Sequence, residues 1–313
     1  MRILRICNLS KKSYLSKYLF NIFPNLKKSV FFKALRNKDI KLNGLRINND
    51  KIIYNDDVLE IYINEHLLFG IPEKIAYIYS DENIIAAFKP QGMLSNIEEY
   101  NDKNLNYYKN IGGVEPTLET LVKKDFRNAR ICHRLDRNTC GIVLFSNNDT
   151  AYNEILSGFT NGYIKKEYIA YVANHIFKKN NDTLEKYIVK DSKTGFSIVY
   201  DNNVKNSQKI ITKYNVIDTN STLDYAILNI QIPTGKTHQI RAQLKQINHP
   251  IIGDSKYGKN EINKKFKIYK QMLFAYKYSF IFKDNMNLAY LNNIIFKLPK
   301  EIYIKKIGEV YEK

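Results

Sequence analysis

The stretch of sequence that decides the fold is Cys132-His133-Arg134-Leu135-Asp136-Arg137-Asn138-Thr139-Cys140-Gly141. Apolar patterns typical of strands lie on both sides of it, so the segment is predicted to turn at the edge of a sheet. Its histidine and three charged side chains fall within five residues, a choice that burial alone does not explain. In an arbitrary loop Asp136 would simply pair with Arg134 or Arg137 in solvent. The segment is therefore a candidate site whose chemistry depends on the rest of the chain.

Two downstream segments are also unusually polar. Residues 233–241 read Pro-Thr-Gly-Lys-Thr-His-Gln-Ile-Arg, a glycine turn followed by a helix predicted over 237–246. Helix N-termini favour anions, so this one suits a phosphate or a carboxylate. In the alternative interpretation Thr237 is an ordinary N-cap and Arg241 is a surface charge. Residues 249–258 alone predict only a turn.

Strand patterns dominate the chain from residue 75 onward, with a few helices between them. Strands are predicted over 75–79, 83–88, 142–145, 164–172, 209–217, 224–232, 272–282 and 293–298. Helices are predicted over 117–126 and 149–159, and another begins at Pro299. The polar residues 96–110 are predicted to form a surface insertion.

The first 63 residues form a predicted separate and strongly basic unit. A helix is expected over 27–37, and a hairpin over 40–47 with the turn residues Asn43-Gly44. The unit carries 13 Lys and Arg against 5 Asp and Glu, a net charge of +8 out of the chain's +18. We therefore predict a basic domain over 1–63, a linker over 64–74 and a second domain over 75–313. The excess of positive charge favours a polyanionic partner, above all a nucleic acid.

Several classes of protein are disfavoured by what the sequence lacks. No apolar run is long enough to span a bilayer, and the N-terminus does not resemble a signal peptide. Three cysteines (Cys7, Cys132 and Cys140) without a CxxC pair indicate free thiols and a cytoplasmic protein. Neither a phosphate-binding loop nor a GxGxxG fingerprint is present, and no histidine pair has metal-ligand spacing. We expect no membrane contact, no metal and no cofactor.

Four motifs, taken together, carry a family resemblance. They are His133-Arg134-Leu135-Asp136 with Thr139 and Gly141, Lys166-Glu167-Tyr168, residues 234–241, and residues 249–254 with Tyr257-Gly258. In this order they resemble the RluA-type pseudouridine synthases, and Lys89-Pro90 resembles that family's first motif. Residues 13–63 resemble the small RNA-binding domain first named for ribosomal small-subunit protein four. The chain departs from the family pattern at Cys140, Lys236 and Phe274, where Ser, Arg and often His are usual.

The resemblance implies an architecture and a reaction. The second domain would be an α+β fold built on a bent, mainly antiparallel mixed sheet with a central active-site cleft, preceded by a small α/β RNA-binding domain. The enzyme would be an isomerase that converts specific uridines of structured RNA to pseudouridine without a cofactor. Ribosomal RNA is favoured as the partner, transfer RNA is possible, and a monomer is expected. A flipped target base would be reached most easily in a loop or a distorted helix.

The resemblance also assigns roles to four residues. Asp136 matches the nucleophile, and Arg241 matches the arginine that pairs with it. Tyr168 matches the tyrosine that stacks on the target base. Arg134 matches the arginine that replaces or steadies the flipped nucleotide. Attack on ring carbon 6 of the uracil and attack on the anomeric carbon of the sugar both remain open.

Two other functions compete with this one. A carboxylate and a cysteine can both add to ring carbon 6, so an RNA uridine methyltransferase with Cys140 as nucleophile is one alternative. The missing glycine-rich fingerprint disfavours it. The other alternative is a non-catalytic RNA-binding protein that keeps the fold without turnover. The presence of Asp136, Tyr168 and Arg241 disfavours it.

Overall fold

The larger of the two main sheets begins at Tyr77, and a smaller unit precedes it in the sequence. The computed structural model describes residues 2–5, 12–63, 67–68, 74–96, 116–192 and 194–304. The chain up to Lys74 forms the small unit, and Ile75–Asn96 with the chain from Thr117 onward form the large one. The expected insertion over 96–110 falls almost entirely outside the described residues.

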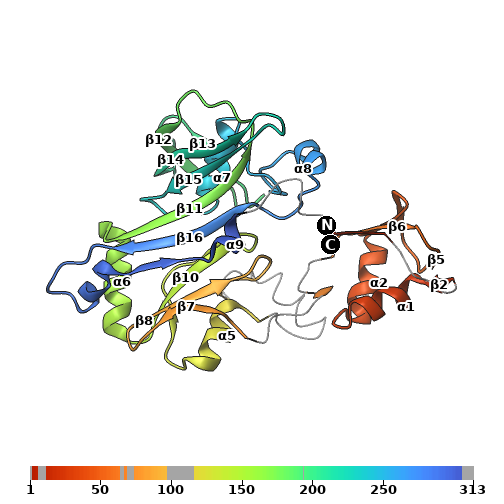
Figure 1. Cartoon of the computed structure of the whole chain (residues 1–313), viewed down its shortest axis with the longest axis horizontal. Helices are drawn as coiled ribbons and strands as arrows, with labels where there is room; N and C mark the ends of the chain where they lie inside the picture. Colours follow the sequence, from red (N-terminus) through yellow and green to blue (C-terminus); the bar gives the residue numbers. More distant parts are fainter. Residues whose placement is uncertain are drawn as a thin grey trace. The chain divides into compact units, whose positions relative to one another are not determined.

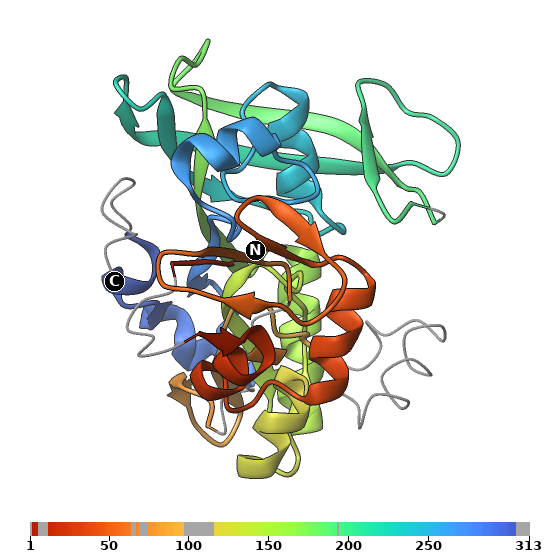
Figure 2. The ribbon, with the colours of Figure 1, turned by 90° about the vertical axis from the view of Figure 1, so that its right-hand side faces the viewer.

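The small unit combines two helices with short antiparallel strands, and Figure 2 shows α1 and α2 beside them. Its elements are β1 (Arg2–Arg5), β2 (Ser13–Tyr14), α1 (Leu15–Ile22), α2 (Lys28–Arg36), β3 (Ile40–Leu42), β4 (Leu45–Ile47), β5 (Ile52–Ile53) and β6 (Val58–Ile61). Four strands pair in the order β1-β6-β3-β4. Apolar side chains of both helices and of the strands share one core, with Leu15, Phe31 and Leu59 fully buried. The amphipathic helices therefore cover a sheet that is too small to be stable alone.

The predicted hairpin of this unit is confirmed. Asn43 and Gly44 both have positive φ angles, 50° and 82°, as a type I′ turn requires. The Asn43 side chain also accepts a hydrogen bond from the Val58 N–H at 2.8 Å. This bond ties the turn to β6 and fixes where the hairpin ends. The helix expected over 27–37 is α2, whereas α1 was not predicted.

The large unit is one mixed sheet with helices beside it (Figure 1). Its strands are β7 (Tyr77–Ser80), β8 (Ile84–Lys89), β9 (Arg130–Ile131), β10 (Cys140–Ser146), β11 (Ile164–Ala173), β12 (Asn181–Lys190), β13 (Ser197–Tyr200), β14 (Gln208–Asn220), β15 (Tyr225–Gln231), β16 (Leu273–Phe280) and β17 (Ile295–Lys297). Its helices are α5 (Leu118–Asp125), α6 (Asp149–Asn161), α7 (Gln239–Gln246), α8 (Asn260–Phe266), the 3₁₀ helix η2 (Asn287–Asn293) and α9 (Lys300–Tyr303).

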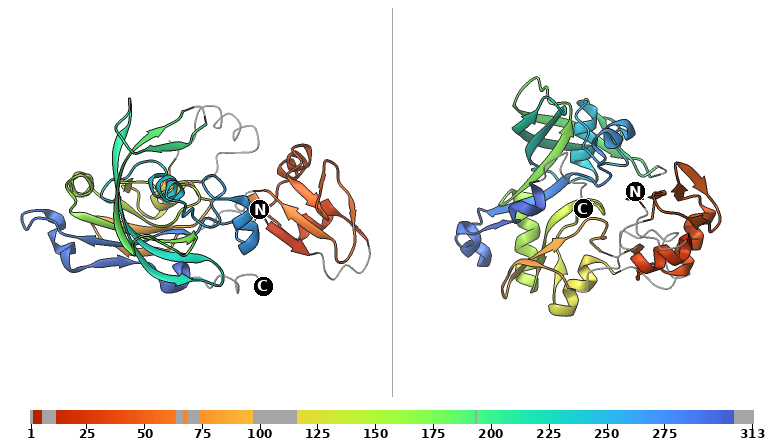
Figure 3. Two further views of the ribbon diagram at one scale, coloured as in Figure 1. Left: turned by 90° about the horizontal axis from the view of Figure 1, so that it is seen from above. Right: turned by 45° about the vertical axis from the view of Figure 1, so that its right-hand side comes forward.

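The strand order places three strands from distant parts of the sequence at the centre of the sheet. The order is β13-β12-β14-β15-β11-β16-β10-β8-β7, with β17 paired to β16 and β9 paired to β10. Every described pairing is antiparallel except that of β10 with β16. The strands twist and curve along the sheet, as Figure 3 shows. The predicted α+β fold with a mixed, mainly antiparallel sheet is confirmed.

The parallel pairing at the centre depends on a glycine. Gly141 has φ +143°, and a Cβ at this position would lie 2.4 Å from the carbonyl oxygen of Ala275 on β16. Only glycine allows two backbones to approach this closely. The step Cys140-Gly141 faces Phe274-Ala275, so the end of the 132–141 segment is locked onto the middle of the sheet.

Several elements differ from the sequence prediction, among them β9, α8 and η2, which were not predicted. The hairpin of β12 and β13 was not predicted either, because β12 is rich in Asn, Asp and Lys, β13 has only four residues, and most residues of both strands are only partly buried or exposed. The helix expected over 237–246 begins two residues later, at Gln239, because His238 has a left-handed backbone (φ 58°). Thr237 is therefore not the N-cap. In the described part of the chain, no helix is long and apolar enough to cross a membrane.

Candidate active site

The loop that carries Asp136 joins β9 to β10. Residues at the end of β8 and in the turn after it form hydrogen bonds to the backbone of this loop. Lys89 is fully buried, and its ammonium donates hydrogen bonds to the backbone carbonyls of Met93 at 2.7 Å and Arg137 at 3.0 Å. The buried Ser95 hydroxyl donates to the Leu135 carbonyl and accepts from the Leu135 N–H. These bonds satisfy a buried cation and fix the backbone on both sides of Asp136.

Asp136 forms an ion pair with a buried arginine of α7. The Arg241 Nη1 donates to Asp136 Oδ2 at 2.7 Å, and the Arg241 side chain is 6% exposed against 25% for Asp136. The interpretation of Arg241 as a surface charge is therefore wrong. The alternative pairing of Asp136 with Arg134 or Arg137 in solvent is also wrong, because Arg241 holds the carboxylate.

A second carboxylate orients the arginine. Arg241 Nε and Nη2 donate to the two oxygens of Asp254 at 2.7 and 3.0 Å, a bidentate pair. Asp254 Oδ1 also accepts from the backbone N–H groups of Lys256 and Tyr257. Burial alone would raise the pKa of Asp254, but Arg241 and these two amides hold that pKa below its usual value. Burial would likewise lower the pKa of Arg241, but Asp254 and Asp136 raise it.

A histidine also lies beside the carboxylate. His238 Nε2 is 3.8 Å from Asp136 Oδ2, and its Nδ1 is 2.9 Å from the hydroxyl of Tyr257. The Tyr257 hydroxyl in turn accepts the Ser197 N–H at 2.6 Å. Burial lowers the pKa of His238 to about 4, although the charge of Asp136 acts in the opposite direction. The imidazole is therefore neutral at neutral pH.

Tyr168 reaches the same site from β11. It is 6% exposed. Burial and then the charge of Asp136 raise its pKa, while a hydrogen bond with Tyr278 lowers it, and the net shift is upward. The phenol therefore stays protonated. The Tyr278 hydroxyl lies 3.4 Å from His133 Nε2, which also accepts the Leu144 N–H at 3.0 Å.

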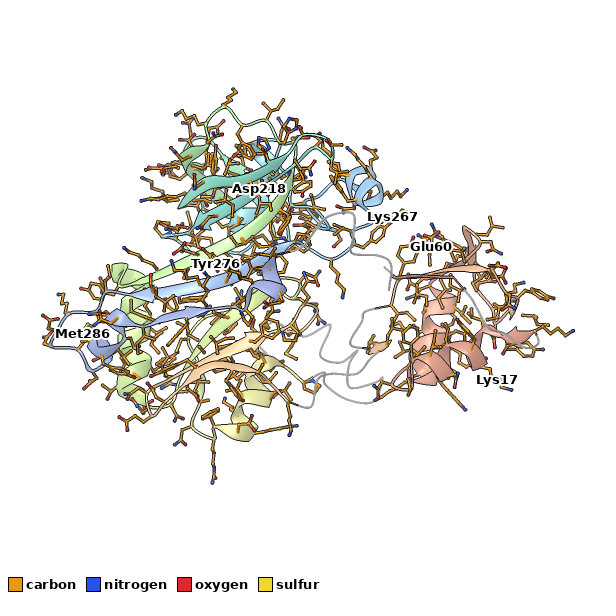
Figure 4. The ribbon with its side chains drawn as sticks, in the orientation of Figure 1. Lys17, Glu60, Asp218, Lys267, Tyr276 and Met286 are labelled. Atoms are coloured by element: carbon orange, nitrogen blue, oxygen red, sulfur yellow. The ribbon has the colours of Figure 1, made fainter. Side chains whose placement is uncertain are left out.

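A β-bulge sets the position of Tyr168. The register of β11 on β16 shifts between Glu167 and Tyr168, so Tyr276 is the extra residue on β16. Tyr276, labelled in Figure 4, donates to Glu167 at 3.2 Å, and Lys277 forms an ion pair with the same carboxylate at 2.7 Å. Bulges re-aim side chains next to active sites. Here the anchored Glu167 fixes the strand immediately before Tyr168.

Comparison with known proteins places this geometry in a family. The model of the RNA pseudouridylate synthases matches residues 83–246, which include Asp136, Tyr168 and Arg241. The chain belongs to the RNA pseudouridylate synthase family. It is an isomerase that converts uridine in RNA to pseudouridine. Membership of this family favours isomerisation over methyl transfer.

Curated relatives align over most of the chain. The ribosomal large subunit pseudouridine synthase C of Rickettsia conorii is 31% identical, covering 82% of this synthase and 85% of the relative. The ribosomal large subunit pseudouridine synthase D of Borreliella burgdorferi is 30% identical, covering 76% and 72%. An RNA pseudouridine synthase of Mycoplasma capricolum is 30% identical, covering 91% and 93%. The solved structure of human RNA pseudouridylate synthase domain containing 1 has a similar fold, with a TM-score of 0.57, 19% identity and coverage of 74% and 85%.

Arg134 and the three departures from the family pattern lie outside this charged cluster. Arg134 is exposed, and no described residue forms an ion pair with its guanidinium. Lys236 is also exposed, and its backbone N–H donates to Gln239 at 3.1 Å. Cys140 and Phe274 are buried opposite each other on β10 and β16. The structure thus brings together Asp136, Tyr168 and Arg241, but not Arg134.

The two cysteines in the described part of the chain do not offer an activated thiolate. Cys132 and Cys140 are buried and form no disulfide bond. Burial raises the pKa of the Cys132 thiol to about 12. A reactive cysteine needs a lowered pKa and some exposure.

Several residues of the site were not predicted to have a role. Sequence reasoning gave no role to Lys89, Ser95, His238, Asp254 or Tyr257. All except Ser95 lie in motifs that the sequence singles out. The signal was therefore present, but which side chains reach Asp136 depends on how β8, α7 and the 249–258 loop meet.

Proposed function

We propose that this synthase isomerises specific uridines of ribosomal RNA, with Asp136 as the nucleophile. The names of the Rickettsia and Borreliella relatives, both of the ribosomal large subunit, support the choice of RNA. One observation carries the assignment of Asp136. From the loop between β9 and β10, this residue forms an ion pair with the buried Arg241 of α7. Arg241 offsets the loss of water that the carboxylate suffers when a base covers the site.

The reaction rearranges one glycosidic bond. The bond from the anomeric carbon to N1 breaks, the uracil turns, and a new bond forms from the anomeric carbon to ring carbon 5. Ring carbon 5 loses its proton and N1 gains one, so the product is an isomer of the substrate. Asp136 adds covalently to the nucleotide and leaves again. The hydrogen bond from Arg241 favours the free carboxylate of Asp136, which is both the attacking and the leaving form. Attack on ring carbon 6 and attack on the anomeric carbon are both compatible with this geometry.

Tyr168 and Arg134 complete the proposed site. The buried phenol of Tyr168 lies within the electrostatic reach of Asp136, and we assign its ring the role of packing against the target base. Arg134 is exposed, so its guanidinium is available to steady the flipped nucleotide and the surrounding RNA. These two roles rest on the family motifs rather than on a contact with Asp136.

We also propose a role for each part of the chain. Residues 1–63 form a basic RNA-binding domain of the ribosomal small-subunit protein four type, residues 64–74 a linker, and residues 75–313 the catalytic domain with its cleft over the middle of the sheet. The net charge of +8 in the first 63 residues supports this assignment.

The test is to map pseudouridine in total RNA with and without the gene, and then to restore the gene with Asp136→Asn. We expect one or more large-subunit ribosomal sites to lose pseudouridine, and the variant not to restore them. Asp149→Asn is a matched control, because Asp149, the first residue of α6, forms an ion pair at the surface with Arg130 of β9. Restoration by Asp136→Asn would refute the nucleophile, and a loss confined to transfer RNA would refute the substrate.

A further inference from the structure

The imidazole of His238 is a fixed hydrogen-bond donor for which the described residues supply no acceptor. Its Nδ1 is occupied by Tyr257, whereas its Nε2 lies 3.8 Å from Asp136 Oδ2. That separation is longer than a hydrogen bond. The described residues make no hydrogen bond to Nε2. The histidine side chain is only 16% exposed, so a bound nucleotide would remove most of its remaining water.

The groups around His238 determine which of its two ring nitrogens carries the proton. The Tyr257 hydroxyl accepts the Ser197 N–H, which leaves its own hydrogen free to be donated to His238 Nδ1 at 2.9 Å. The carboxylate of Asp136 beside Nε2 favours a proton on that nitrogen. Tyr257 is 2% exposed, and its ring lies 5.0 Å from the Arg241 guanidinium, so it cannot turn away. The neutral imidazole therefore presents its Nε2–H toward Asp136.

The backbone at His238 supports a functional role for this arrangement. Its φ of 58° and ψ of 17° put a residue with a Cβ in the left-handed region, at the residue before α7. Such a conformation costs energy and is enriched at functional sites. Here it aims the side chain along the start of α7, toward the carboxylate that Arg241 also contacts.

We propose that His238 is a substrate-contacting residue of the synthase, whose Nε2–H donates a hydrogen bond to an oxygen of the reacting nucleotide when that nucleotide lies against Asp136. The proposal rests on the proposed role of Asp136. The acceptor is either a uracil carbonyl or a ribose hydroxyl, because both are hydrogen-bond acceptors close to the carbons open to attack. Since Arg241 occupies Oδ2, and the described residues donate no hydrogen bond to Oδ1, we assign Oδ1 as the attacking oxygen.

Three variants separate the donor from the backbone conformation. His238→Asn keeps a residue that tolerates left-handed φ, but its shorter side chain cannot reach the position of Nε2. His238→Gln restores an N–H donor at greater length. We expect His238→Asn to lose about 10- to 100-fold in kcat/KM, mostly in kcat, and His238→Gln to lose less. The RNA dissociation constant and Tm should change little. His175→Asn is the matched control, because His175 pairs with Asp224 at the end of β11 and should keep full turnover.

The second experiment identifies the acceptor. The probe is a synthetic hairpin of large-subunit ribosomal RNA that carries the mapped uridine, prepared with uridine, 2-thiouridine, 4-thiouridine or 2′-deoxyuridine at that position. A hydrogen bond from His238 makes one replacement harmful to the wild type but nearly neutral in His238→Asn. The two thio replacements report on the uracil carbonyls, and the deoxy replacement reports on the ribose 2′-hydroxyl. Equal penalties in wild type and variant for all three would refute the contact.

A third measurement tests the tautomer without relying on turnover. Nitrogen-15 chemical shifts of His238 in the full-length protein should show Nε2 protonated and Nδ1 unprotonated between pH 6 and 8. Tyr257→Phe, which keeps the ring and removes the hydroxyl, should shift this balance toward the other tautomer. Nδ1 protonated in the wild type would overturn the proposal.

The failures of the two proposals can be told apart. His238→Asn with at least half the wild-type kcat/KM, alongside an inactive Asp136→Asn, would overturn the role of His238 and leave the nucleophile standing. A fully active Asp136→Asn would overturn the proposed function itself. If His238→Asn loses activity and its Tm also falls substantially, the role of His238 is structural, which also overturns the proposal.

Discussion

At the scale of single residues, the site depends on how one guanidinium is shared. Arg241 gives two nitrogens to Asp254 and the third to Asp136. Asp254 has 0% side-chain exposure, so it has no water to replace the arginine. The arginine is thus fixed by a carboxylate that is more deeply buried than Asp136, and Asp136 contacts a donor whose position is already set.

Removing the arginine should therefore cost stability as well as rate. Arg241→Ala leaves Asp254 buried without its partner, and breaking a buried pair in this way costs about 3–5 kcal/mol. Arg241→Lys keeps the charge but not the fork, so it should lose less. The measurement is urea unfolding together with turnover.

The control for this prediction is Arg130→Ala. Arg130 pairs with Asp149 at the surface, where such pairs are worth about 0–1 kcal/mol. Equal losses in Arg130→Ala and Arg241→Ala would contradict the buried pair.

A pH dependence follows from His133, a partly buried histidine of the loop that carries Asp136. Burial, and then the neighbouring Lys166 ammonium, lower the pKa of His133 from 6.5 to about 3. Below pH 6.5 the unfolded chain binds this proton and the folded chain does not, so stability falls as the pH falls. Between pH 7 and pH 5 this histidine alone should cost about 2 kcal/mol. The measurement is the free energy of unfolding in urea at both pH values.

The variant for this test is His133→Gln, whose amide oxygen can accept the Leu144 N–H in place of His133 Nε2. It should lose about that part of the acid sensitivity, and other groups should keep theirs. An unchanged difference between pH 7 and pH 5 would show that His133 is not buried in its neutral form.

Which residues could be predicted from the sequence depends on how local their signal is. The motifs of the family singled out Asp136 and Arg241, which the structure brings together at 2.7 Å. They gave no role to Asp254, because its importance comes from packing α7 against the loop after it. The exposed Arg134 lies in the same motif as Asp136, which shows that a motif does not tell which of its side chains are buried.

At the scale of elements, the parallel pairing of β10 with β16 at the centre of the sheet limits which substitutions the fold can tolerate. Gly141→Ala would place a Cβ 2.4 Å from the Ala275 carbonyl oxygen, so one of the two central strands has to move. We expect a loss of more than about 3 kcal/mol, or no soluble protein at all, because overpacking adds to the strain of the positive φ. The measurements are soluble yield and urea unfolding.

The control is Gly162→Ala at the end of α6. Gly162 also has positive φ, 75°, but a Cβ there meets nothing within 4 Å. It should cost only about 1–2 kcal/mol, the strain of a left-handed residue. Equal behaviour of the two variants would mean that the close approach of the backbones is not what requires Gly141.

Elements with clear periodicity were predictable, and those set by the tertiary structure were not. The long strands β11, β14 and β15 were predicted to within a few residues, because β-branched and aromatic side chains recur along them. The strand β12 contains many polar side chains, and β13 is a four-residue strand at the edge of the sheet, so neither gives a clear strand pattern. The start of α7 was predicted two residues early, because no propensity rule predicts a left-handed histidine.

At the scale of the whole molecule, charge is distributed unevenly along the chain. The first 63 residues hold +8 of the total +18, and the remaining 250 residues hold +10. In the small unit Lys28, Arg36 and Lys38 are exposed, whereas Lys41 is half-buried and pairs with Glu60 at 3.2 Å. Since the fold of this unit needs few of these cations, their charge is available for phosphates.

Neutralising three of these cations therefore tests the RNA-binding role with both units intact. Lys28→Gln, Arg36→Gln and Lys38→Gln together should weaken RNA binding and lower the slope of log affinity against log salt by about 2, or roughly 0.7–0.9 for each phosphate that the protein no longer neutralises. Turnover at saturating RNA should stay near the wild-type value, because Asp136, Tyr168 and Arg241 lie in the large unit. The matched control neutralises Lys205, Lys283 and Lys297, three exposed lysines of the large unit, and so removes the same net charge. If the slope falls equally in the two triple variants, only overall charge matters, and the small unit does not bind the RNA specifically.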